Sequence, residues 1–74
     1  IMMKKKVLDI ASELFGEEVT MDTKIGDIKK WDSLGQINLF MALESELNLS
    51  FGHEDVIECN SIEKIASLIE KNEN

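Results

Sequence analysis

The stretch from Trp31 to Phe40, WDSLGQINLF, places a serine between an acid and a leucine where a helix is expected to begin. Serine and aspartate are both preferred at helix starts, because their side-chain oxygens accept free backbone N–H groups. Ser33, followed three residues later by Gln36, also matches the capping-box pattern. Capping alone would therefore explain this serine. With Asp32 equally able to cap the helix, however, the Ser33 hydroxyl is free to point outward.

The start of a helix also suits one kind of covalent modification. A phosphate ester on Ser33 would lie at the positive end of the helix dipole, beside unpaired N–H groups. Enzymatic use of the serine is disfavoured, because no base is placed beside it and the only histidine, His53, cannot supply a persuasive triad. Ser33 is thus either a helix cap or a site of attachment.

The helix that follows Ser33 carries more apolar surface than a single core contact needs. At roughly 100° per residue, one stripe is formed by Leu39, Phe40, Leu43 and Leu47, and a neighbouring stripe by Leu34, Ile37 and Met41. Two readings of the second stripe are open: the preceding loop covers it, or it is a docking surface for a protein partner. Met41 suits the second reading, because its flexible thioether adapts to different partners.

The elements that must position this motif are helical. Apolar residues at three-and-four spacing predict a first helix from Lys4 to Phe15, stopped by Gly16, and a second from Ser33 to Leu47, ending near Asn48. Residues 17–30 read as a long loop pinned to the core by Val19, Met21, Ile25 and Ile28. A short turn or helix is expected within residues 50–58, and Asn60 with Glu63 is expected to cap the last helix. The fold class is all-α: a small four-helix bundle with a long first loop and a short third helix.

Composition narrows the class of protein. A chain of 74 residues supports one core, so we expect a single domain over residues 1–74, with Ile1 added ahead of a natural start at Met2. The net charge of −7 disfavours nucleic acid and anionic membranes as partners and favours proteins with basic surfaces. One cysteine and no secretory or membrane-spanning segment suggest a reducing, cytoplasmic setting.

Four other features have simple interpretations. We expect Cys59 to be a small buried hydrophobe and His53 a solvated surface residue with no metal site around it. The basic run Lys4–Lys6, at a helix start where acids are favoured, reads as a solvated tail. Trp31 either anchors the loop in the core or lines the path of an attached group, and the sequence does not decide between them.

The motif Asp32-Ser33-Leu34, followed by apolar positions and then Met41-Ala42-Leu43-Glu44, resembles the acyl carrier protein family along essentially the whole chain. The resemblance implies a monomeric carrier rather than an enzyme. A phosphopantetheinyl transferase would move 4′-phosphopantetheine from coenzyme A onto Ser33, and the thiol of that arm would hold an acyl or aminoacyl group as a thioester. Asp32 and Leu34 would assist this attachment, and Leu34, Ile37, Met41 and Glu44 would form the face recognised by a ligase, synthase or acyltransferase.

The chain departs from the fatty-acid carriers at two positions. Those carriers often have acids where this chain has Gly35 and Asn38. The departures suggest a dedicated carrier for a specialised pathway, although the resemblance alone leaves fatty-acid, polyketide and peptide synthesis open. The alternative from another class is a small helical interaction module that binds a partner through the same apolar stripe and carries no prosthetic group.

Overall fold

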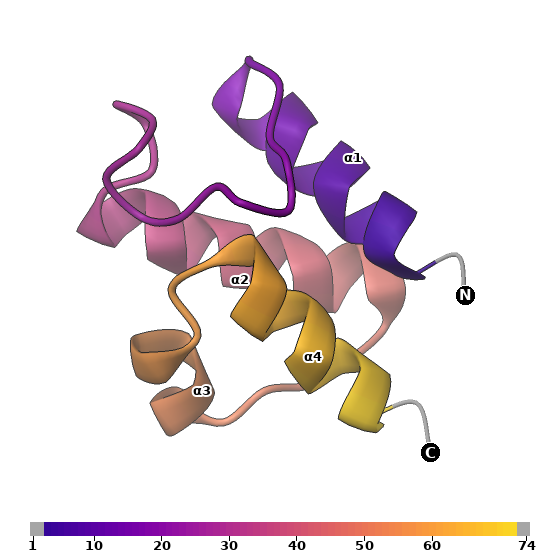
Figure 1. The fold of residues 1–74 in the computed structure, drawn as a ribbon. Coiled ribbons are helices and arrows are strands. Elements are labelled where there is room, and N and C mark those ends of the chain that lie inside the picture. Colours follow the sequence, from indigo (N-terminus) through magenta and orange to yellow (C-terminus); the bar gives the residue numbers. More distant parts are fainter. Residues whose placement is uncertain (1–2, 73–74) are drawn as a thin grey trace.

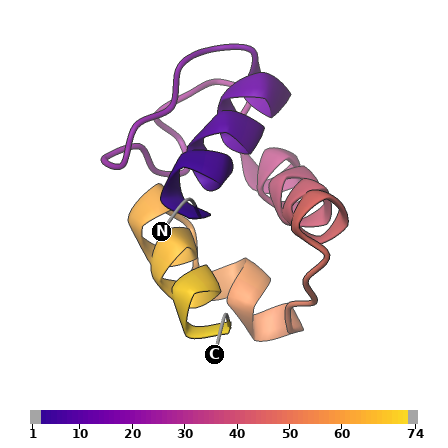
Figure 2. The same ribbon diagram turned by 90° about the vertical axis from the view of Figure 1, so that its right-hand side faces the viewer.

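The computed structural model describes residues 3–72, most of which lie in four helices (Figure 1). Their bounds are Met3–Phe15 for α1, Ser33–Leu47 for α2, His53–Glu58 for α3 and Ile62–Asn72 for α4. Helix α1 packs against α2 and α4, and α3 packs against α2. Figure 2, turned by 90° from Figure 1, shows the helices arranged around the centre of the molecule. The predicted all-α fold, with its long first loop and short third helix, is confirmed, whereas the expectation about Ile1 falls outside the described residues.

Helices α1 and α4 each bury an apolar stripe at helical spacing, although Leu14, predicted to share the stripe of α1, is 37% exposed. The buried residues are Val7, Ile10, Ala11 and Phe15 in α1, and Ile62, Ile65, Ala66 and Ile69 in α4. Gly16 ends α1 with a φ of 73°, a left-handed conformation that glycine adopts without a steric penalty. These two helices form one wall of the core against which α2 lies.

The long loop from residue 17 to residue 32 is held in place by its apolar side chains and by backbone hydrogen bonds. Val19 and Ile28 are buried, and Met21 and Ile25 are partly buried against the core, as predicted. The N–H of Ile25 donates to the carbonyl of Asn60 at 2.9 Å, and the N–H of Ile62 donates to the carbonyl of Thr23 at 3.0 Å. The loop therefore fixes the link between α3 and α4 as well as the entry into α2.

Two local predictions are wrong. Asn60 does not cap α4, because the hydroxyl oxygen of Ser61 accepts the N–H of Lys64 at 3.2 Å and the helix begins one residue later than that cap requires. The run Lys4–Lys6 is exposed but belongs to α1 rather than to a tail. An ion pair between Lys5 and Asp9 at 2.9 Å, one helical turn apart, accompanies this helical conformation.

Candidate functional site

Asp32 is the residue that caps α2. Its backbone is extended, and its carboxylate oxygen Oδ1 accepts the N–H of Gly35 at 2.8 Å. The predicted capping box of Ser33 and Gln36 is wrong, because the Gln36 side chain turns into the protein instead. Capping is thus provided by Asp32, the second of the two candidates that the sequence offers.

Ser33 is the first residue of α2 and is exposed to solvent. Within residues 3–72, its hydroxyl makes no hydrogen bond with another group. It lines a surface depression of about 240 Å³ that lies between α2 and α3, together with Ile37, Val56 and Ile57. An exposed hydroxyl that does not cap the helix is accessible to a modifying enzyme.

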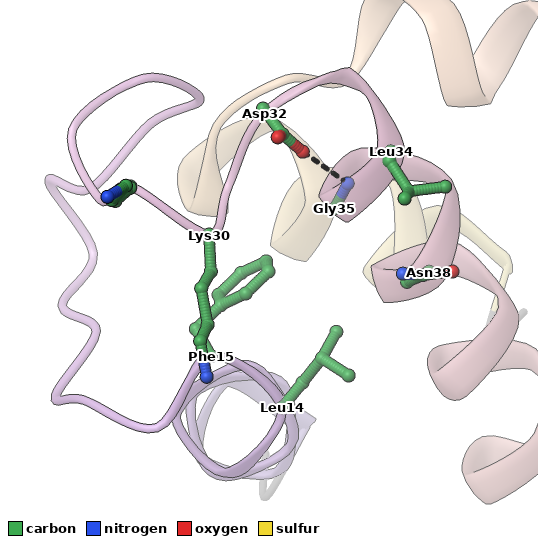
Figure 3. A pocket seen from close by; sticks show the side chains of 8 residues that line it. Leu14, Phe15, Lys30, Asp32, Leu34, Gly35 and Asn38 are labelled. Carbon is green, nitrogen blue, oxygen red and sulfur yellow. Dashed lines mark hydrogen bonds between the residues drawn. The ribbon is translucent and has the colours of Figure 1, made fainter.

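A second depression, of about 530 Å³, lies on the other side of the first turn of α2 (Figure 3). Leu14 and Phe15 of α1 form one side of it, and Leu34 and Asn38 of α2 form the other. The Lys30 side chain runs across Phe15 toward the end of α1. The first turn of α2 is therefore open to solvent on two sides.

The second apolar stripe of α2 is uncovered. The exposed fraction is 65% for Leu34, 50% for Ile37 and 62% for Met41, so the reading in which the long loop covers this stripe is wrong. The loop instead packs on the core through its own apolar side chains. Glu44 follows on the same face, is partly buried, and accepts the N–H of Phe51 with its carboxylate at 2.9 Å.

Gly35 is buried where α2 meets the loop and α1. A Cβ atom at this position would overlap the carbonyl oxygen of Lys30 and approach the Phe15 ring to 3.3 Å. Glycine is therefore required at position 35 by a close approach of two backbones.

Trp31 anchors the loop in the core. It is completely buried, and its ring stacks on Phe15 with a centroid distance of 5.4 Å. Its indole Nε1–H donates to the side-chain oxygen of Gln36 at 2.7 Å. These contacts confirm the anchoring role, the first of the two that the sequence left open for Trp31. They also identify Gln36 as the hydrogen-bond partner of Trp31. The sequence alone did not indicate this role, because Gln36 matched a capping pattern there.

Two titratable groups outside the motif, Asp27 and Cys59, have shifted pKa values. The backbone N–H of Lys24, followed by its ammonium group, holds the pKa of Asp27 below its usual range. Partial burial, followed by the Asp55 and Glu58 carboxylates, raises the pKa of the Cys59 thiol. Cys59 is partly buried against the core, so it is less buried than predicted, and His53 is exposed, as predicted.

Residues 3–72 lack two further kinds of feature. No group of His, Cys, Asp and Glu side chains in this range is arranged to hold a metal ion. None of its helices is long and apolar enough to cross a membrane.

The sequence is similar to that of the D-alanyl carrier protein of Streptococcus suis (strain 05ZYH33), with 37% identity in an alignment of 67 positions that covers 81% of this chain and 85% of that protein. The chain belongs to the acyl carrier protein family. Within that family it is a homologue of a specialised carrier, and it is a carrier protein rather than an enzyme. No family model and no solved structure matches the chain.

The structure places the candidate residues of this carrier protein in one region. Asp32 and Ser33 form the start of α2, and the exposed side chains of Leu34, Ile37 and Met41 continue along the same helix. Glu44 lies farther along, with one carboxylate oxygen engaged by the backbone. A serine hydroxyl and an apolar face are thus presented together at the surface.

Proposed function

We propose that this protein carries a D-alanyl group on a 4′-phosphopantetheine arm attached to the Ser33 hydroxyl and presents it to partner enzymes. The observation that carries the proposal is the exposed Ser33 at the first position of a helix that Asp32 already caps. The name of the Streptococcus suis relative supports D-alanine as the cargo. The same relative supports the specialised role suggested by Gly35 and Asn38 over general fatty-acid or polyketide synthesis.

The residues around Ser33 fit a phosphodiester. Helix starts leave backbone N–H groups without intrahelical acceptors, and within residues 3–72 the N–H groups of Ser33 and Leu34 have no such partner. The helix dipole adds positive potential at the same point. When bound, the arm would supply the thiol that holds an aminoacyl group as a thioester. The chain itself supplies the attachment oxygen, the fixed helix start and the surface that partners recognise.

Partner enzymes would be recognised by shape and charge. Leu34, Ile37 and Met41 offer an apolar face that stays exposed in the free protein, which is a feature of interaction sites. Glu44 and the net charge of −7 favour partners with basic docking surfaces. The expected partners are a phosphopantetheinyl transferase, to which Asp32 would present Ser33, and a ligase that loads the amino acid.

Intact mass tests the attachment. The wild-type chain is incubated with coenzyme A and a broad-specificity phosphopantetheinyl transferase, with Ser33→Ala as the matched control. A gain of about 340 Da in the wild type alone, the mass of that ester, is expected. If the folded wild type gains no mass while the transferase modifies a control carrier, Ser33 has no attachment role and the interaction module without a prosthetic group is favoured.

The cargo needs a second measurement on the modified protein. After incubation with ATP, a D-alanine-activating ligase and D-alanine, the mass should increase by one alanyl residue. Treatment with hydroxylamine should remove the addition, because thioesters are cleaved by that nucleophile. Loading with other carboxylic acids in preference to D-alanine would contradict the proposed cargo while leaving the attachment at Ser33 intact.

A further inference from the structure

Gln36 joins three parts of the chain through its side chain. Its amide oxygen accepts the Trp31 indole N–H at 2.7 Å, and its amide nitrogen donates to the carbonyls of Val56 and Cys59, both at 2.8 Å. Gln36 is only 6% exposed and is the one buried polar residue among those described. Because buried hydrogen bonds leave costly unpaired groups when one partner is removed, this side chain fixes the loop, α2 and the end of α3 to one another.

Helix α3 depends on such attachments. It has six residues, none of them buried, and helices this short are not stable by themselves. The chain just before its N-terminal end is held by Phe51. The Phe51 ring packs edge-on against Phe40 at a centroid distance of 5.2 Å, and the Phe51 N–H donates to the Glu44 carboxylate. Its C-terminal end is held by the two hydrogen bonds that the Gln36 side chain donates to the carbonyls of Val56 and Cys59.

The position of α3 determines what lies beside Ser33. Ile57 is 61% exposed, and it lines the same 240 Å³ depression as Ser33 and Ile37. An exposed isoleucine on α3 therefore continues the apolar face of α2 around the attachment point. If α3 moved away from α2, this depression would lose the wall that Val56 and Ile57 provide.

We propose that Gln36 is a positioning residue: it holds α3 against α2 so that Ile57 forms part of the surface that the Ser33-modifying enzyme meets. The inference rests on the proposed function for its second half, the role of Ile57. Its first half, the hold on α3, concerns the free protein alone. The two halves are therefore tested by separate measurements.

The main variant is Gln36→Glu. An ionised glutamate keeps an oxygen for the Trp31 N–H but has no donor for the carbonyls of Val56 and Cys59. Asn38→Asp is the matched control, because it makes the same amide-to-acid change at an exposed position two residues away on α2. Ile57→Ser tests the surface without removing a buried group.

Hydrogen exchange measures the hold on α3. The N–H of Cys59 donates to the carbonyl of Asp55 at 2.9 Å and reports on the last turn of this helix. Two lost hydrogen bonds of ordinary strength correspond to a fall in protection of roughly thirtyfold. That fall is expected for Gln36→Glu relative to Asn38→Asp, with α1 amides unchanged. Equal protection of the Cys59 amide in the two variants would overturn the first half.

Transferase kinetics measure the role of Ile57. Gln36→Glu and Ile57→Ser should each raise KM for the carrier several-fold and leave kcat unchanged, because the reacting hydroxyl is untouched. An unchanged KM in Ile57→Ser would overturn this half, and that variant remains informative if Gln36→Glu fails to fold. A wild-type chain that is never modified would refute the proposed function and the role of Ile57, while hydrogen exchange would still decide whether Gln36 holds α3.

Discussion

Replacing Gly35 by alanine sets two effects of opposite sign against each other. Alanine is favoured over glycine inside a helix by about 1 kcal/mol, so propensity alone predicts a more stable protein. The structure predicts the reverse, because the new methyl group would overlap the Lys30 carbonyl and press on the Phe15 ring. The Phe15 ring cannot move freely, since it is buried and stacked on Trp31.

The steric effect is expected to win. Extra methyl groups in well-packed sites typically cost about 1–3 kcal/mol, and values near the upper end apply where backbone atoms must shift. After the gain in helix propensity, we expect the free energy of unfolding to fall by about 1–2 kcal/mol. For a chain of this size, about 1 kcal/mol corresponds to a fall in Tm of roughly 4–8 °C.

Urea unfolding followed by circular dichroism measures this difference. Gly52→Ala is the matched control, because a Cβ there would meet only the Asp55 carboxylate, at an ordinary contact distance of 3.6 Å. At that exposed cap position the change should stay within about 1 kcal/mol. If Gly35→Ala is as stable as the wild type or more so, the contact with Lys30 is not rigid and the steric explanation of this glycine is wrong.

Three further predictions concern the cap, the exposed face and the thiol. Asp32→Ala should lower the free energy of unfolding by about 1 kcal/mol, because the Gly35 N–H loses its acceptor; an unchanged urea midpoint would contradict the cap. Met41→Ser should change stability by less than about 0.5 kcal/mol, because this side chain is exposed, yet raise the transferase KM; equal kinetics would exclude Met41 from the recognition face. Iodoacetamide should alkylate Cys59 more slowly than free cysteine at the same pH, because the raised pKa leaves less thiolate; an equal rate would contradict the shift. Because the pKa of the Cys59 thiol is raised in the folded protein, folding favours the neutral thiol. The contribution of this group to the free energy of unfolding is therefore present at neutral pH and should be lost as pH rises through that raised pKa.

Periodicity predicted α1, α2 and α4 because each of these three helices buries a stripe at helical spacing, whereas α3 buries no residue. The bounds of α2, Ser33–Leu47, follow from an acid that can cap its start and from Asn48, whose φ of 56° ends it in the left-handed conformation. The loop residues Val19 and Ile28 were also predictable, because isolated apolar residues in a polar loop have few other uses than to pack on the core.

Side-chain direction was less predictable. Gln36 and Ser33 match a capping box in sequence, but Gln36 faces inward and bonds to residues 20 and 23 positions away, which no local pattern reports. Ser61 takes the capping role expected of Asn60, because both residue types suit a helix start and the loop contacts set the first turn. The reason for Gly35 lies in a contact with Lys30 that exists only after the loop has packed.

One side of helix α2 stabilises the bundle, and the opposite side is the one that we propose partner enzymes recognise. Leu39 and Leu43 are completely buried, so truncating either leaves a cavity and weakens the bundle. Leu34 and Met41 contribute little to folding because they remain exposed, and an uncovered apolar face carries a risk of aggregation that a merely structural helix has no reason to keep. The net charge of −7 opposes association of like molecules while leaving this face open to basic partners. In the proposed function, acidity and the exposed apolar residues, which look opposed in the composition, complement each other: the apolar face meets partner enzymes, and the negative charge keeps the carrier apart from its own copies.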